Sequence, residues 1–284
     1  MPKPSSKPKS EYAIQTVTNA LRMLEVFHSE NEMGVSDLSR ALGLHKNNAF
    51  RLLATLELAG YIQQTPATEQ YHLGPRCLEL GHAFARSHTL LQQARPLLEE
   101  LASEIGETAH LGVLSGREVV HLDGVLPQQL LLSGLRVGER LDAHCTAVGK
   151  ALLAGEIANS NLGSVQGGSE GAAGSIERSP LIPGAQFAPT ELARYTETTL
   201  CDPAKLMEEL RAIGLRGYAT DMEEYAPGLR CVAAPVRDAS ARVVAALSLS
   251  GPSTRLDEKS LHGRFAAAIS ATAMRLSGQL GSPV

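Results

Sequence analysis

The chain has few cysteines and no pair of them at metal-binding spacing. Its four cysteines, Cys77, Cys145, Cys201 and Cys231, are far apart and form no CxxC pair. This pattern favours reduced thiols, because disulfide frameworks and zinc sites need cysteines at recurrent spacings. We therefore expect neither a disulfide-stabilised fold nor a zinc site, and no cofactor is predicted.

Long apolar runs are also missing. The longest weakly polar stretch, Val243–Leu249, is far too short to span a bilayer. The N-terminal sequence MPKPSSKPKS lacks the apolar core of a secretory signal. We expect a cytoplasmic protein. A chain of 284 residues, 43% apolar and 20% charged, is long enough for two globular domains.

An excess of basic residues is missing as well. The formal net charge is −4, and residues 11–75 contain four Lys or Arg against seven Asp or Glu. The bulk charge therefore does not indicate a polyanionic partner. Placement matters more than the sum, because phosphates would meet only one face of a domain. Residues 1–10 carry three lysines and are expected to be a disordered basic tail.

Residues 11–75 show the pattern of a winged helix-turn-helix. Apolar residues at helical spacing predict a first helix over 17–28, with Thr16 or Thr18 as its N-cap and Leu21 and Phe27 on its apolar face. A short second helix with Ser36 as N-cap precedes a turn at Gly43. The third helix is expected to bury Phe50, Leu53 and Leu56 and to end at Gly60. The stretches YIQQ and YHLG then predict a β-hairpin wing.

Polar side chains gather at the start of the third helix. Asparagine amides can read adenine bidentately, and Arg or Lys can read guanine or hold phosphate. A surface helix whose polar end merely caps itself remains an alternative. The residues predicted to contact DNA are Ser36, Arg40, His45, Lys46, Asn47, Asn48 and Arg51.

The remainder of the chain indicates an α+β domain. Residues 76–90 are predicted as a linker helix, and residues 91–284 as an effector-binding domain. Short hairpins dominate this domain, which favours a mostly antiparallel sheet. Pro96 is expected in the first turn of a new helix. Residues 155–190, rich in Gly, Ser, Ala and Pro, are expected to form a long surface insertion or loop.

Enzymatic alternatives find little support. A pair of His144 with Cys145 or Cys231 would suggest a hydrolase, but His144 and Cys145 are adjacent, so their side chains diverge, and no third residue orients them. The VGK at 148–150 lacks the glycine that a phosphate-binding loop needs five residues before Gly149. His110, His121 and His144 have no metal-ligand spacing. We expect a protein that is not an enzyme.

With these residues in view, the chain resembles the IclR family of transcriptional regulators over nearly its whole length. The run from Gly217 to Asp238, with Asp221, Glu224 and Cys231, is its most specific part. The resemblance implies a GAF-like effector-binding domain and a homodimer or a tetramer built as a dimer of dimers. The matching stretches are ALRMLEVF, LSRALGLHKNNAFRLLATLELAGYI, YHLG, AHCTAVGKALLA, RGYATDMEEYAPGLRCVAAPVRD and ALSLSGPSTR.

The resemblance also implies a pocket for a small organic acid. Ser248 and Ser250 alternate along a predicted strand and so share one side, and backbone amides near Val148 and Gly149 offer an anion site. Arg237 stands where the family usually has an aromatic residue, Ala147 replaces a glycine of some members, and the insertion at 156–185 has no clear counterpart. The effector-binding residues implied are Leu130, Ser133, Ala147, Val148, Asp221, Cys231, Ser248 and Ser250.

We therefore expect a transcriptional regulator that binds a double-stranded DNA operator and responds to a small organic acid effector. The alternative is a sensor or interaction module without DNA binding. That alternative requires the helix containing His45 and Arg51 to be covered.

Overall fold

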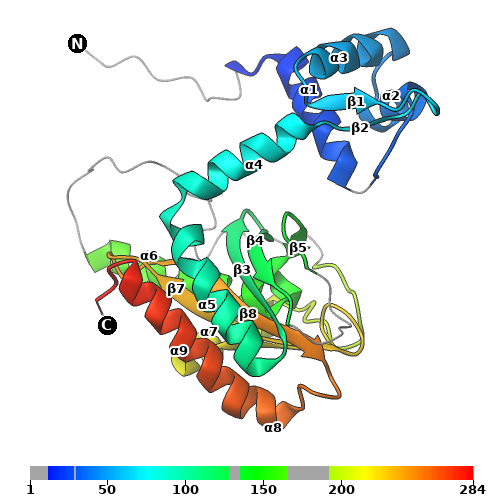
Figure 1. Ribbon diagram of the computed structural model, residues 1–284. Coiled ribbons are helices and arrows are strands. Elements are labelled where there is room, and N and C mark those ends of the chain that lie inside the picture. The colour runs from blue at the N-terminus through cyan, green and yellow to red at the C-terminus, as the bar shows by residue number, and fades with distance from the viewer. Residues whose placement is uncertain (1–11, 29, 128–134, 166–191, 284) are drawn as a thin grey trace, which may run out of the picture. The chain divides into compact units, whose positions relative to one another are not determined.

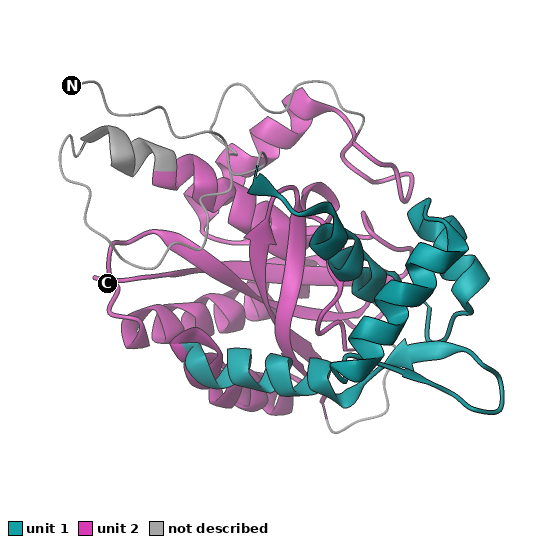
Figure 2. Ribbon diagram, turned by 90° about the horizontal axis from the view of Figure 1, so that it is seen from above, with its two compact units in different colours: residues 1–88 teal, residues 89–284 magenta. Residues whose placement is uncertain are grey.

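The chain divides into two compact units, residues 1–88 and 89–284 (Figure 2). The computed structural model describes residues 12–28, 30–127, 135–165 and 192–283. The predicted tail at 1–10 and most of the predicted insertion lie outside these residues. The described part of that insertion, residues 155–165, continues a helix and is not a loop, so the prediction was wrong there. Within the described part, no helix is long and apolar enough to cross a membrane.

The first unit is a three-helix core with a small hairpin (Figure 1). Gly43 ends α2 with a φ of +66°, a conformation that glycine adopts without steric cost. The three helices and the hairpin bury one cluster that includes Met23, Leu38, Leu53 and Ile62. The elements are α1 (Gln15–Glu25), η2 (Val26–His28), α2 (Val35–Leu42), α3 (Lys46–Leu58), β1 (Ile62–Gln64), β2 (Tyr71–Leu73) and α4 (Pro75–Ser87).

This unit confirms the predicted winged helix-turn-helix and corrects details of it. The helices α1 and α2 each begin earlier than expected, at Gln15 and Val35, so neither Thr16, Thr18 nor Ser36 caps them. Phe50 and Leu21 were predicted to be buried, but they are 54% and 56% exposed. The core takes Ala49 and Leu53 from α3, so Phe50 lies outside the buried face.

The second unit holds a six-stranded antiparallel sheet of order β5-β4-β3-β8-β7-β6. Helices α5 and α9, which contact each other, pack on one face, and α6 and α7 pack on the other (Figure 1). The strands are β3 (Thr108–Ser115), β4 (Glu118–Val125), β5 (Arg140–Asp142), β6 (Ala219–Met222), β7 (Leu229–Arg237) and β8 (Val243–Pro252). The helical segments are α5 (Thr89–Ile105), η3 (Ala143–Cys145), α6 (Ala147–Val165), α7 (Pro203–Arg216), α8 (Glu258–Ser260), η4 (Leu261–Phe265) and α9 (Ala266–Gln279).

The helices around residue 90 differ in part from the predictions. The predicted linker, 76–90, spans α4 and the first residues of α5. Pro96 lies inside α5 and not in the first turn of a helix, so that prediction was wrong. The apolar face of α5 continues on both sides of the proline, with Leu91, Leu97 and Leu98 all buried, and this packing accounts for the uninterrupted helix.

The strand register brings distant parts of the sequence into one row. Asp221 of β6 pairs with Cys231 of β7, and Cys231 pairs with Ser250 of β8. In the next row Ser248 of β8 pairs with His110 of β3. Because side chains alternate along strands, these five point to the same face as Ala246, which packs in the α6 cluster.

Candidate functional site

The polar cluster of the first unit lies at the start of α3. His45 is the N-cap residue of α3, and Lys46, Asn47 and Asn48 occupy its first turn. Arg51 follows one turn later on the same side of the helix. All seven residues predicted to contact DNA are exposed: Ser36, Arg40, His45, Lys46, Asn47, Asn48 and Arg51.

Arg40 differs from the rest of this cluster because it has an acidic partner. Its Nη1 donates to Asp37 Oδ1 at 3.1 Å, and both side chains are more than half exposed. An exposed pair of this kind contributes little to stability. Arg40 can therefore exchange Asp37 for a phosphate at small cost, although Asp37 balances the charge of Arg40 within α2.

The second unit contains a cavity on the α6 side of its sheet. The cavity has a free volume of about 30 Å³, roughly the room for one water molecule. All six described residues of the predicted effector site line it: Ala147, Val148, Asp221, Cys231, Ser248 and Ser250. Leu130 and Ser133, the other two, lie outside the described residues.

The first turn of α6 closes one end of the cavity. Ala147 and Val148 are buried there, and Thr146 precedes them. Thr146 Oγ1 accepts a hydrogen bond from the Gly149 amide at 3.2 Å, so that amide, one of those predicted to bind an anion, already has a partner. Gly149 also permits close packing, because a Cβ there would lie 2.2 Å from the Ala143 carbonyl oxygen.

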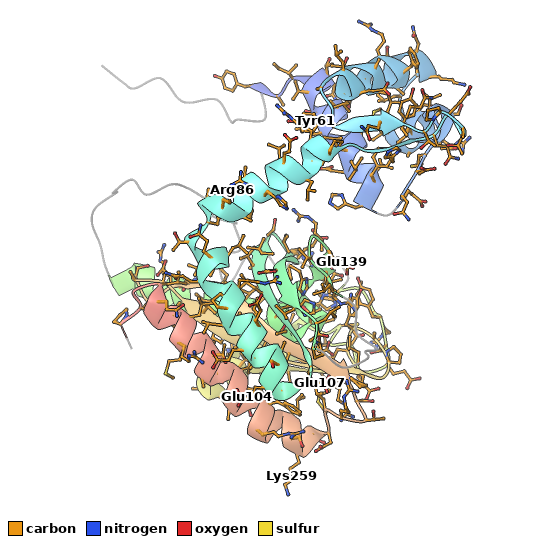
Figure 3. The ribbon with its side chains drawn as sticks, in the orientation of Figure 1. Tyr61, Arg86, Glu104, Glu107, Glu139 and Lys259 are labelled. Carbon is orange, nitrogen blue, oxygen red and sulfur yellow. The ribbon has the colours of Figure 1, made fainter. Side chains whose placement is uncertain are left out.

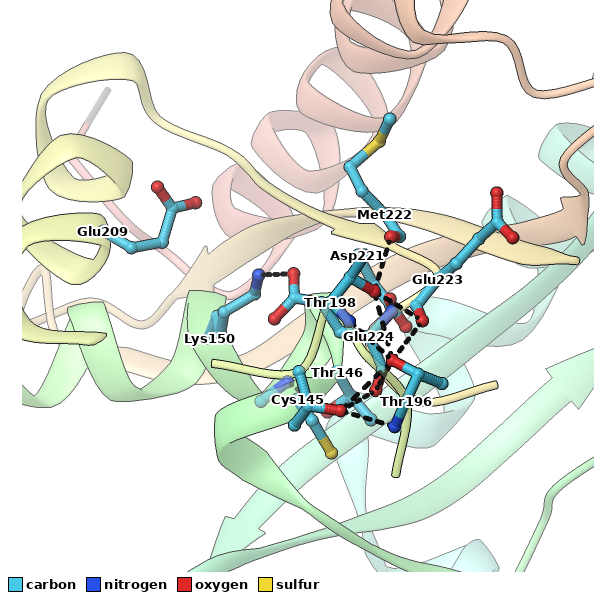
Figure 4. A network of polar contacts seen from close by, with 12 residues as sticks. Cys145, Thr146, Lys150, Thr196, Thr198, Glu209, Asp221, Met222, Glu223 and Glu224 are labelled. Atoms are coloured by element: carbon cyan, nitrogen blue, oxygen red, sulfur yellow. Dashed lines mark hydrogen bonds and ion pairs between the residues drawn. The ribbon is translucent and has the colours of Figure 1, made fainter. Parts of the chain in front are cut away.

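Asp221 is buried at the end of β6, where the chain turns. Its Oδ1 accepts a hydrogen bond from the Glu224 amide at 2.7 Å (Figure 4). Burial raises the pKa of Asp221 to about 7, the nearby charge of Glu224 raises this pKa too, and the Glu224 amide and Lys150 oppose the shift. Asp221 can therefore either donate or accept a proton in a hydrogen bond near neutral pH.

The turn that follows Asp221 and β6 is fixed from two sides. Lys150 of α6 forms a buried ion pair with Glu224. From the segment after the undescribed residues, Thr199 Oγ1 donates to the Glu224 carbonyl at 2.7 Å and Thr196 Oγ1 donates to the Glu223 carbonyl at 2.8 Å (Figure 4). These contacts position Asp221 and Tyr225, both of which line the cavity.

Sequence reasoning missed five polar residues of the cavity, His110, His121, Arg136, Thr146 and Tyr225. The rings of His110 and His121 meet edge to face with centroids 5.2 Å apart. Burial, with a smaller contribution from the charge of Arg136, lowers the pKa of His110 to about 3 and that of His121 to about 4. Both rings are therefore neutral at physiological pH. Their pairing partners on β3, β4 and β8 could not be known without the strand register.

The arrangement does not support a thiol nucleophile. Burial, with smaller contributions from Asp221 and Asp142, raises the pKa of Cys145 to about 12, and burial raises that of Cys231 well above its ordinary value. The Nε2 of His144 lies 2.9 Å from the Ala193 carbonyl oxygen. A reactive cysteine needs the opposite shift in pKa. Among the described residues, no group of three or more His, Cys, Asp or Glu side chains is placed to hold a metal ion.

Comparisons with known proteins match both units. Residues 16–66 match the family description "IclR helix-turn-helix domain", and residues 82–161 and 184–278 match "Bacterial transcriptional regulator IclR C-terminal". The HTH-type transcriptional regulator XynR of Escherichia coli strain K12 is 36% identical over 271 residues, which cover 95% of this chain and 98% of that protein.

Solved structures agree with this match. The Thermotoga maritima IclR aligns with a TM-score of 0.68 and 26% identity, over 95% of this chain and 100% of that one. An IclR homolog from Microbacterium hydrocarbonoxydans, crystallised in complex with 4-hydroxybenzoate, aligns with a TM-score of 0.72 and 23% identity, over 93% of this chain and 98% of that one.

Proposed function

We propose, from the premise that this chain belongs to the IclR family of bacterial transcriptional regulators, that it binds an operator through α3 and that a small organic acid in the cavity of its second unit controls this binding. Proteins of this family are DNA-binding regulators and not enzymes. Membership of the family therefore gives the general activity, and the proposal for the DNA-contacting helix and the effector rests on residues of this chain.

The exposed start of α3 is the observation that carries the DNA-binding half. His45, Lys46 and Asn48 lie at the N-terminal end of a helix that follows a helix-turn-helix turn, and that end is open to solvent. A recognition helix contacts base edges from this end. The alternative, a sensor without DNA binding, requires a covered helix, whereas these residues are exposed. Glu57, the acidic residue of α3, lies three turns further along the helix, away from this end.

Two exposed apolar rows support a homodimer as the DNA-binding form. Val17 and Leu21 lie on one side of α1, Ile14 is the N-cap residue before this helix, and each of the three is more than half exposed. Leu80 and Phe84 form a similar row on α4. Apolar rows of this kind are usually covered by a partner. A dimer would place two copies of α3 in successive major grooves, about 34 Å apart, and a dimer of dimers is the larger assembly that we propose.

The cavity supports the effector half of the proposal. Ser248, Ser250 and Asp221 offer hydrogen bonds to hydroxyl or carboxylate groups, and Cys231 and Val148 provide apolar contact. The Microbacterium hydrocarbonoxydans homolog holds 4-hydroxybenzoate, an organic acid, and we extend only the class of ligand to this chain. The effector would act through the helices α4 and α5 that join the two units, by changing the half-site spacing that a dimer can reach.

A gel-shift assay on the DNA upstream of the protein's own gene tests the DNA-binding half. We expect retardation at low salt that weakens steeply as salt rises, because released counterions drive the association. No retardation at low salt would remove the DNA-binding proposal. The effector half is tested with Ser248→Ala, which should weaken the response to organic acids and leave DNA binding without effector intact. A regulator acting on bacterial DNA works in the cytoplasm, where we place this one.

A further inference from the structure

Arg136 lines the cavity but is not among the residues predicted to bind the effector. It lies between the undescribed residues and β5, and it lines the cavity. Its side chain is 28% exposed, so the guanidinium is partly withdrawn from water. Its present partner is Glu139, half exposed and labelled in Figure 3, whose Oε2 lies 3.2 Å from Arg136 Nη1. An exposed partner of this kind is readily exchanged.

The surroundings of Arg136 hold the guanidinium against the cavity. Its Cζ lies 5.0 Å from the centre of the Tyr225 ring, a cation–π distance. The Tyr225 ring in turn lies 5.3 Å from the Tyr195 ring, whose hydroxyl donates to Asp142 Oδ2 at 2.9 Å. The Arg136 amide donates to His110 Nε2 at 3.4 Å. The guanidinium of Arg136 thus packs on Tyr225, and the backbone amide of Arg136 is held by the buried ring of His110.

His121 supplies a second, independent sign of a ligand. The side chain is 96% buried, as its 4% exposure shows, and it lines the cavity. Its Nδ1 is buried and has no hydrogen-bond partner among the described residues. An unsatisfied buried ring nitrogen costs free energy unless a ligand or water completes it.

The charges of the cavity favour an anion beside Arg136. His110 and His121 are neutral, and the charge of Lys150 is matched by Glu224, with which it is paired. Among the described residues that line the cavity, this leaves Arg136 as the permanent cation. Asp221, the acidic residue of the lining, lies on β6, on the other side of β7, β8 and β3 from the His121 strand β4. The lining therefore combines one permanent cation, Arg136, with Asp221, an acid whose raised pKa allows it to be neutral.

We propose that Arg136 and His121 form the subsite that selects an anionic effector, with Arg136 binding its carboxylate and His121 Nδ1 forming a hydrogen bond with the polar group of the effector beside it. The effector's carboxylate replaces Glu139 as the partner of Arg136. The lining has to move apart to admit such a ligand, because the free volume of the cavity is only about 30 Å³. Hydroxyl groups elsewhere on the effector then reach Ser248, Ser250 and Asp221, so the ligand class is a hydroxylated organic acid. This inference rests on the proposed function, and it adds the residues that distinguish an acid from its neutral analogue.

The experiment compares glycolate with glycolamide, which have similar shapes but differ in charge. Chemical shifts of nitrogen-labelled histidine rings in the full chain report binding, and His121→Gln assigns the His121 signals. We expect glycolate to shift the ring signals of His110 and His121 saturably and glycolamide to leave them unchanged. Arg136→Met should weaken glycolate binding at least about tenfold, the loss of one charge-assisted contact, and Arg136→Lys should retain more of it.

Arg140→Met is the matched control, because Arg140 pairs with Glu118 and is not among the residues that line the cavity. It should bind glycolate as the unaltered chain does. Equal binding of glycolate and glycolamide, or unchanged glycolate binding in Arg136→Met, overturns the inference. If Ser248→Ala weakens glycolate binding while Arg136→Met does not, the effector cavity stands and only the Arg136 subsite falls. If glycolate shifts neither ring, the subsite is overturned, and the gel-shift assay still decides DNA binding separately.

Discussion

Lys150, in α6, and Glu224, in the turn after β6, form an ion pair in which the side chains are only 2% and 7% exposed. The pair joins the helix that closes the cavity to the turn that directly follows Asp221 and β6. Glu224 Oε2, the second carboxylate oxygen, has no hydrogen-bond partner among the described residues. The pair therefore depends on the lysine alone to compensate a buried negative charge.

Replacing this lysine should be costly. Lys150→Met leaves the Glu224 carboxylate buried without a cation, and we expect the free energy of unfolding of the second unit to fall by about 3–5 kcal/mol. Urea unfolding followed by circular dichroism measures the loss. The double variant Lys150→Met/Glu224→Leu should regain much of it, because no charge is then buried. As a control, Arg275→Met breaks the exposed pair with Glu100 and should change the stability very little. A loss equally small in Lys150→Met would contradict this account.

Asp221 should make the stability of the second unit depend on pH. Its pKa in the folded state, about 7, lies above the ordinary value of 3.8. Between these two values the folded state keeps a proton that the unfolded state has released, so stability falls as pH rises, by at most about 1.4 kcal/mol per pH unit. Above the folded pKa the loss is complete and stays constant.

The variant Asp221→Asn isolates this effect, since the amide oxygen can still accept the hydrogen bond from the Glu224 amide. We expect its unfolding free energy to change less between about pH 5 and pH 7 than that of the unaltered chain, and the difference between the two to grow with pH. Urea titrations at several pH values give both curves. Parallel curves would show that Asp221 is ionised in the folded state throughout this range.

The residues of the cavity that could be predicted were those that follow a local sequence pattern. Ser248 and Ser250 alternate on one strand, and alternation alone assigns them to one face. His110 and His121 could not be found in this way, because they meet through the pairing of β3 with β4 and the packing of their rings. Arg136 follows no repeating pattern at all, and only the folded chain places its guanidinium over Tyr225.

The same distinction explains the errors in the first unit. Gly43 and Gly60 were assigned correctly, since each has a positive φ that its local sequence suggests. Phe50 was placed in the core on hydrophobicity, but Ala49 and Leu53 fill that space, and a bulky aromatic side chain beside them remains outside. Apolar character does not determine which of two neighbouring residues faces inward.

Gly149 should tolerate no side chain. A Cβ at this position would lie within 2.3 Å of both the Cα and the carbonyl oxygen of Ala143, and backbone cannot yield as a flexible side chain can. We expect Gly149→Ala to lower the melting temperature of the second unit by several degrees, in keeping with a cost of roughly 1–3 kcal/mol. Gly214→Ala in α7 is the matched control, because a Cβ there meets nothing within 4 Å and should stabilise the helix slightly. Similar melting temperatures for the two variants would refute the packing argument.

Substitutions at the start of α3 should distinguish residues that contact bases from residues that contact phosphates. If Asn48 and Arg51 contact bases, Asn48→Ala and Arg51→Ala should each cost about 1–3 kcal/mol on the operator and less on unrelated DNA. If Lys46 contacts a phosphate, Lys46→Ala should weaken binding to all sequences alike and lower the salt dependence by about one ion. Fluorescence anisotropy on both DNAs at several salt concentrations measures these effects.

The control for charge is Arg211→Ala, because Arg211 is an exposed arginine of α7 in the second unit and belongs to neither proposed surface. It should leave both affinities and the salt dependence unchanged. If it weakens binding as much as Arg51→Ala does, general electrostatic attraction, and not α3, dominates the interaction. If the α3 variants weaken operator and unrelated DNA equally, α3 holds DNA without reading it, and the residues that choose the operator must lie elsewhere in the chain.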